Sequence, residues 1–270
     1  MQRGTVVPPV SPLTSFIDGI RKRGFHNHRL CGHADALRDA IVDDLALCCP
    51  SFKADLAHGV IARWENVRDL GARSRKLDLV IAEANRDGGP NLKKLRICLK
   101  SKSVMTAHRS RDSRFADLYA TLQVLEDLKS EAVLVATVIV GVAEKVLNVP
   151  DDVKPLYKKR PGKFESEVLP RLSSGDQSLW DQFERAVSVN RPDDPRITIE
   201  KFRELPTRRP GRTHEAGYDY VLLVPALIDN VNPPSIPLPS DPKSFGIDVG
   251  RDYAKMIEIM CKAYNARWHL

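Results

Sequence analysis

The chain has 270 residues, of which 42% are hydrophobic and 29% are charged, with a formal net charge of +7 and a sequence pI near 9.2. This is the composition of a globular protein with a sizeable core, and the length suits one large domain or one domain with an appended lobe. The longest apolar run, residues 132–143, is too short to span a bilayer, and the N-terminus lacks the apolar core of a signal peptide. The positive charge favours polyanionic partners.

The cysteines indicate the compartment. There are five of them, an odd number, and none forms a CxxC pair: Cys31, Cys48, Cys49, Cys98 and Cys261. Disulfides persist in oxidising compartments and usually come in even sets. We therefore expect reduced thiols in a cytoplasmic protein.

Apolar residues at helical or alternating spacing divide the chain into predicted elements. The first 14 residues hold three prolines and few core formers, which indicates an arm. Residues 132–141 are apolar and rich in β-branched side chains, which is typical of a central strand. In chain order, the elements are an arm (1–32), a helix (33–49), an edge segment (58–66), two strands joined by a turn (76–84 and 92–106), a helix (112–129), the central strand (132–141), a helical stretch in two pieces (163–189), an irregular basic stretch (191–217), a strand (218–228) and a final helix (249–268).

The order of these elements predicts a mixed α/β fold around one sheet. We expect residues 33–270 to form a single domain, preceded by the N-terminal arm of residues 1–32. A helical and irregular insertion at about 145–217 is expected to separate the central strand from the last one.

The predicted hairpin brings opposite charges to one face. Because strand side chains alternate between faces, Lys100 and Lys102 lie on one side of the second strand, and Asp78 can face them from the first. A buried lysine is costly without partners, so a charged site is one interpretation. The simpler one is a ladder of edge-strand lysines whose charged ends reach solvent.

The hairpin and the tract after it resemble the PD-(D/E)XK nuclease superfamily. That family carries an aspartate at the end of one strand, a turn, and glutamate–x–lysine on the next strand. The segment "KSVMTAHRSRDSRFADL" (102–118) is similar to one that follows E-x-K in a subset of these enzymes. The resemblance covers roughly residues 33–141 and the strand "GYDYVLLVP" (217–225).

The resemblance implies a restriction-endonuclease-like central mixed sheet flanked by helices. It implies a Mg²⁺-dependent endodeoxyribonuclease that cuts duplex DNA, most readily a type II restriction endonuclease acting as a homodimer. In this register Asp78 matches the metal-binding aspartate and Lys102 matches the catalytic lysine. Lys100 occupies the position of the glutamate that is the second metal ligand.

Lys100 departs from the family pattern, because an ammonium group has no lone pair for Mg²⁺ and repels it. Three explanations stay open. The chain carries an inactivating change at position 100, or another carboxylate among Glu83, Asp39 and Asp43 holds the metal, or the protein binds DNA without cleaving it. A less specific repair or phage-defence nuclease is a further alternative.

Two basic stretches are candidate DNA contacts. The first enters the predicted helix 112–129, where free N–H groups suit phosphate oxygens. The second is the irregular "RRPGRTH" (208–214), of a kind that can enter a DNA groove. A solvated charged surface is the plainer reading of both. The candidate DNA-binding residues are His108, Arg109, Arg111, Arg114, Arg208, Arg209 and Arg212.

Overall fold

The computed structural model describes most of the chain. The predicted N-terminal arm lies outside the described residues except for Ile17 and Gly32, and Arg212 also lies outside them. The described residues are 17, 32–68, 76–128, 131–147, 164–209 and 215–269.

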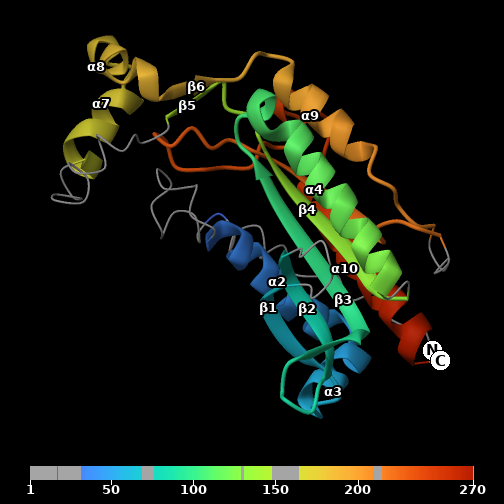
Figure 1. Ribbon diagram of the computed structural model, residues 1–270. Helices are drawn as coiled ribbons and strands as arrows, with labels where there is room; N and C mark the ends of the chain where they lie inside the picture. The colour runs from blue at the N-terminus through green and yellow to red at the C-terminus, as the bar shows by residue number, and fades with distance from the viewer. Residues whose placement is uncertain are drawn as a thin grey trace.

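A five-stranded mixed sheet forms the centre of the fold, as the sequence predicts (Figure 1). Its first three strands pair antiparallel with their neighbours, the fourth pairs parallel with the third, and the fifth pairs parallel with the fourth. Parallel pairing needs crossover connections, which the helices supply. In sheet order the strands are β1 (Ala62–Arg68), β2 (Lys76–Ala84), β3 (Pro90–Val104), β4 (Val133–Gly141) and β7 (Tyr220–Ala226).

Both sides of the sheet are covered by helices. All nine residues of β4 are buried, as expected for a parallel strand with both faces covered. Figure 1 shows α4 crossing in front of the sheet and α10 running behind it. The helices α4 (Ala107–Leu128) and α9 (Asp194–Arg203) pack together on one side, and α10 (Val249–Trp268) packs with α2 (Gly32–Cys48) and α3 (Pro50–Ala57) on the other.

The last helix illustrates how the sequence builds these layers. Asp248 caps α10 by accepting a hydrogen bond from the backbone N–H of Arg251 at 3.0 Å. Apolar residues then recur every three or four positions and turn one stripe towards the sheet. The buried residues of this stripe are Val249, Tyr253, Met256, Ile257, Met260 and Tyr264.

Two predictions of local structure need correction. The helix predicted over 33–49 is confirmed as α2, but Pro50 opens a second helix, α3, which the sequence analysis missed. Proline suits the first turn of a helix because its missing N–H has no partner there anyway. The stretch 191–217 was predicted to be irregular, and this is wrong for α9, which buries Ile199 and Phe202 in the main core.

Part of the predicted insertion has a small core of its own. Its two short strands pair antiparallel, and the described residues contain a second hydrophobic cluster formed by Leu147, Phe164, Leu169, Leu172, Leu179, Ala186 and Val231. The short elements of the chain are β5 (Lys145–Leu147), η2 (Phe164–Val168), α7 (Leu169–Ser173), α8 (Gln177–Gln182), η3 (Glu184–Ala186), β6 (Val187–Val189) and, near α10, η4 (Pro242–Ser244).

Two further expectations concern membranes and disulfides. Within the described residues, none of the helices carries an apolar stretch that could cross a bilayer. The cysteines in this part of the chain, Cys48, Cys49, Cys98 and Cys261, are all free thiols, as predicted.

Candidate functional site

The β2–β3 pairing places Asp78 and Lys100 across from each other. Leu79 pairs with Leu99 and Val80 with Cys98, and the same antiparallel register sets Asp78 opposite Lys100. The Lys100 ammonium lies 3.4 Å from Asp78 Oδ1 and also donates a hydrogen bond to a backbone carbonyl at the start of β2. The predicted convergence of these two side chains is therefore present.

Lys100 is buried and Asp78 is anchored. The Lys100 side chain is only 5% exposed and that of Asp78 is 22% exposed. Asp78 Oδ2 accepts a hydrogen bond from the backbone N–H of Ser101 at 2.8 Å, which fixes the carboxylate against β3. A buried ammonium with a carboxylate and a carbonyl as partners has its charge compensated. Lys100 is thus an internal member of a polar site, and the reading as a solvent-facing edge lysine does not apply to it.

The second lysine meets a carboxylate that the sequence analysis did not select. Lys102 Nζ forms an ion pair with Asp117 Oδ2, and both side chains are largely shielded from solvent. Asp117 lies on α4, the helix that follows β3 and packs against it. The sequence signal was present, because Asp117 belongs to the "RFADL" tract that contributed to the family resemblance. Its direction towards the hairpin depends on how α4 packs, which the sequence alone did not reveal.

The four charged groups form one cluster, which we call the Asp78–Asp117 site: Asp78, Lys100, Lys102 and Asp117. Burial lowers the pKa of Lys100; the negative charges of Asp78 and Asp117 oppose this shift, and the positive charge of Lys102 adds to it. The charges of Asp78, Lys102 and Asp117 therefore all act on the Lys100 ammonium, and Asp78 does so at 3.4 Å. With two carboxylates and two ammonium groups, the site has no net charge when all four are ionised.

The donor groups of this site fit a hard divalent cation. Mg²⁺ prefers oxygen ligands and keeps several waters, so one or two carboxylates suffice to bind it. Asp78 provides one carboxylate, paired with Lys100, and Asp117 of α4 provides another, paired with Lys102. Nowhere in the described part of the chain do three or more Asp, Glu, His or Cys side chains form a metal-binding group. A metal would therefore depend on these two carboxylates and on water.

Two of the other carboxylates considered from the sequence pair with basic side chains outside the Asp78–Asp117 site. Glu83 pairs with two basic residues of β3, at 2.5 and 3.3 Å. Asp39 pairs with Arg38 at 3.3 Å and with Arg63. Asp43 is exposed on α2. Asp117 is the better candidate for the second carboxylate, because its basic partner is Lys102, the residue that matches the catalytic lysine.

The first group of predicted DNA contacts lies in the first turns of α4, which begins at Ala107. Arg114 is exposed, and Arg111 is partly exposed and pairs with the neighbouring Asp112 at 3.1 Å. His108 and Arg109 belong to the first turn, but their side chains lie outside the described residues. Arg111 and Arg114 can therefore contact a phosphate, and they lie on the same helix as Asp117.

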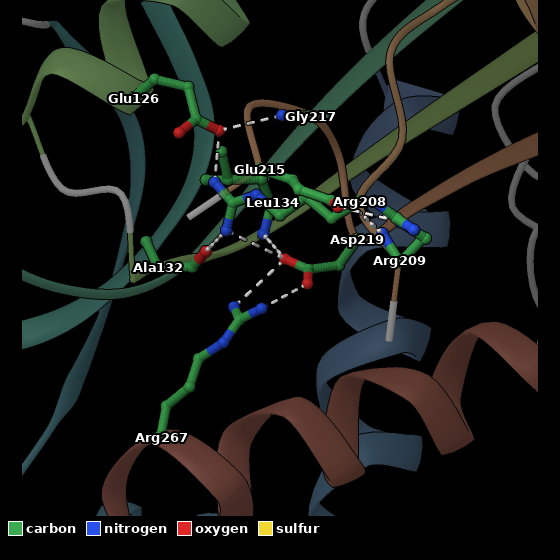
Figure 2. A network of polar contacts seen from close by, with 9 residues as sticks. All are labelled: Glu126, Ala132, Leu134, Arg208, Arg209, Glu215, Gly217, Asp219 and Arg267. Atoms are coloured by element: carbon green, nitrogen blue, oxygen red, sulfur yellow. Dashed lines mark hydrogen bonds and ion pairs between the residues drawn. The ribbon is translucent and has the colours of Figure 1, made fainter. Parts of the chain in front are cut away.

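The prediction for Arg208 is wrong. Its side chain is 1% exposed, donates to the carbonyl of Ala132 at 3.1 Å and pairs with Glu126. Figure 2 shows its guanidinium group surrounded by these partners and by Asp219, 3.8 Å away. A side chain held in this way does not reach a DNA groove. Arg209 is 71% exposed and pairs with Glu215, so it remains a candidate contact.

Asp219 is the centre of this buried network. It accepts a hydrogen bond from the backbone N–H of Leu134 at 2.8 Å. It also forms an ion pair with Arg267 of α10, whose side chain is 6% exposed. Glu126 also accepts the backbone N–H of Gly217 at 3.2 Å. The network, drawn in Figure 2, joins α4, the start of β4, the approach to β7 and the end of α10. Its role is to hold the layers of the fold together.

Comparison with known proteins adds no relative. No protein-family model, curated protein or solved structure matches the chain. A function must therefore be inferred from the residues of the Asp78–Asp117 site and its surroundings.

Proposed function

We propose that this chain is a Mg²⁺-dependent endodeoxyribonuclease that hydrolyses phosphodiester bonds in duplex DNA. The observation that carries the proposal is the ion pair between Lys102 of β3 and Asp117 of α4, two residues along β3 from the pair of Lys100 and Asp78. Asp117 supplies the second carboxylate that Lys100 cannot supply. The resemblance to PD-(D/E)XK nucleases supports the same chemistry from the sequence.

Each residue then has a role that follows from its contacts. Asp78 and Asp117 would hold the metal, and a bound Mg²⁺ supplies Lewis-acid stabilisation and lowers the pKa of a bound water. The Ser101 N–H keeps Asp78 oriented. Lys102, shielded from solvent, donates to a phosphate oxygen as negative charge develops on it during attack, where an ammonium group is most effective in a dry site.

The proposal extends to the partner and the assembly. The proposed contacts to backbone phosphates come from Arg111 and Arg114 on α4 and from Arg209, between α9 and β7. Such contacts position the duplex without reading its sequence. Cutting both strands of a palindromic site calls for two symmetry-related active sites, so we propose a cytoplasmic homodimer of the type II restriction class. Discrete fragments on digestion would support this class, and a smear would favour a less specific repair or phage-defence nuclease.

The test is plasmid digestion in the presence of Mg²⁺ with single-residue variants. Asp117→Asn, Asp78→Asn and Lys102→Met should each reduce the cleavage rate by about 100-fold or more, as loss of a charged active-site group commonly does. Asp127→Asn is the matched control, because Asp127 is an exposed carboxylate near the other end of the same helix. If Asp117→Asn cleaves DNA at the wild-type rate, Asp117 is not part of the active site.

A second candidate function is DNA binding without cleavage. The observation that favours it is the contact between Lys100 and Asp78, which leaves one metal ligand occupied by a fixed ammonium group. This alternative predicts salt-sensitive binding of duplex DNA by the wild-type chain, and no cleavage even by Lys100→Glu. Cleavage by the wild-type chain would exclude it.

A further inference from the structure

We propose that the Lys100 ammonium is a built-in cation that holds Asp78 in the metal-free protein and competes with a divalent metal ion for this carboxylate. The inference rests on the proposed function only in taking the Asp78–Asp117 site as the place where metal binds. It assigns Lys100 a role of its own, beyond an inactivating replacement of a carboxylate.

The contacts of Lys100 are those of a bound cation. Its ammonium group meets a carboxylate oxygen of Asp78 and the backbone carbonyl of Lys76, and both are hard oxygen acceptors of the kind that divalent cations use. Asp78 is also held from its other oxygen by Ser101 N–H, so the carboxylate stays in place whether or not a cation is bound. The ammonium and a metal ion would therefore compete for the same oxygen of a fixed ligand.

The position of Lys100 in the sheet makes it an effective competitor. It lies in the middle of the pairing between β3 and β4, where its backbone is matched with Ala136. Its side chain is 5% exposed, so the ammonium group is held away from solvent. A tethered ammonium in such a place has a high local concentration beside Asp78 and no need to diffuse to it.

The charge balance points the same way. Two carboxylates and two ammonium groups leave the Asp78–Asp117 site without net charge, so these four groups together exert no net long-range attraction on a further cation. Removing the Lys100 charge leaves two carboxylates against Lys102 alone, a net negative site. Metal affinity should therefore rise when Lys100 becomes neutral, even though no ligand is added.

The experiment measures Mn²⁺ binding to the full chain without DNA, by electron paramagnetic resonance titration of free Mn²⁺. Lys100→Met keeps a long, unbranched side chain and removes the charge. It should bind Mn²⁺ at least about tenfold more tightly than wild type, because one charge at contact distance shifts an ionisation equilibrium by about that factor. Lys94→Met is the matched control, since Lys94 is an exposed lysine of the same strand, and it should bind as wild type does. The double variant Lys100→Met/Asp78→Asn should lose the gain.

The thermal midpoint of unfolding is a second readout, which also shows whether a variant has lost stability. Lys100→Met leaves Asp78 without its cation, so its thermal midpoint should fall and should then rise on adding Mg²⁺, more than the wild-type midpoint does. Lys100→Gln, which keeps a donor for the carbonyl of Lys76, replaces Lys100→Met should that variant fail to unfold cooperatively.

The outcomes separate this inference from the proposed function. Equal or weaker Mn²⁺ binding by Lys100→Met overturns the inference, as does a gain that persists in the double variant, and neither result bears on cleavage. Tighter binding by Lys100→Met with no DNA cleavage by any variant supports the inference and overturns the nuclease proposal.

Discussion

Arg208 and Arg209 are adjacent arginines that the structure assigns to opposite environments, and replacing each by methionine tests that assignment. Arg208→Met removes a guanidinium group that is 1% exposed and bonded to Glu126, Asp219 and the carbonyl of Ala132. Arg209→Met removes one that is 71% exposed and pairs with Glu215. The two variants make the same chemical change one residue apart.

The magnitude for Arg208 follows from what its loss leaves behind. Removing one partner of a buried ion pair costs about 3–5 kcal/mol, because the other charge stays buried without compensation. Asp219 keeps Arg267, and Glu126 keeps the N–H of Gly217, so the lower end of that range applies. We therefore expect the free energy of unfolding to fall by about 3 kcal/mol for Arg208→Met. Arg209→Met should leave the free energy of unfolding at the wild-type value, because its ion pair is in solvent.

Urea denaturation followed by circular dichroism measures both variants. With a slope of about 3 kcal/mol/M, the midpoint for Arg208→Met should fall by about 1 M. DNA binding supplies the complementary readout. Arg209→Met should weaken DNA binding, and the slope of log affinity against log salt concentration should become shallower by about 1, as expected for the loss of one phosphate contact. Equal urea midpoints for the two variants would refute the buried network. Weaker DNA binding by folded Arg208→Met, with Arg209→Met unchanged, would restore the sequence prediction.

Further predictions concern acid stability, packing and metal. Burial alone would raise the pKa of Asp55, but hydrogen bonds from Tyr264 and His269 and the charge of Arg96 lower it below its ordinary value of 3.8. Asp55 therefore contributes stability that is complete above that value and is lost as the pH falls through the lower pKa of the folded state. Asp55→Asn should flatten the acid side of a profile of unfolding free energy between pH 2 and 6, and an unchanged profile would contradict the shift. Gly141→Ala should destabilise the protein by about 1–3 kcal/mol in urea, because the added methyl would overlap the backbone of Met105; an unchanged midpoint would contradict the packing at the end of β4. EDTA should abolish plasmid cleavage and added Mg²⁺ should restore it; cleavage that persists in EDTA would exclude a metal-dependent site.

The sequence predicted the parts of the fold that depend on local pattern. A β-rich segment, a strong turn and a second strand-like segment predicted β2 and β3, and the apolar run with β-branched residues predicted β4 as a buried central strand. The convergence of Asp78 and Lys100 followed from strand geometry, because alternate residues of a strand point to the same face of the sheet. The mixed sheet flanked by helices followed from the order of these elements.

The parts that the sequence did not predict depend on contacts between distant segments. Asp117 reaches Lys102 because α4 folds back on β3, and the helical pattern does not say which polar residue will meet the strand. Arg208 is buried by Glu126 and Asp219, which have no local relation to it. Charge and proline suggested an irregular loop, and α9 forms there because its few apolar residues find the main core.

The most direct test of the proposed nuclease is the rate at which Asp117→Asn cuts a supercoiled plasmid in Mg²⁺, relative to the wild-type chain. Cleavage by the wild-type chain and a loss of about 100-fold or more in Asp117→Asn is the result we predict, because the proposal assigns to Asp117 the role of the second metal-binding carboxylate. An intact plasmid with the wild-type chain, or equal rates for the two proteins, would contradict it.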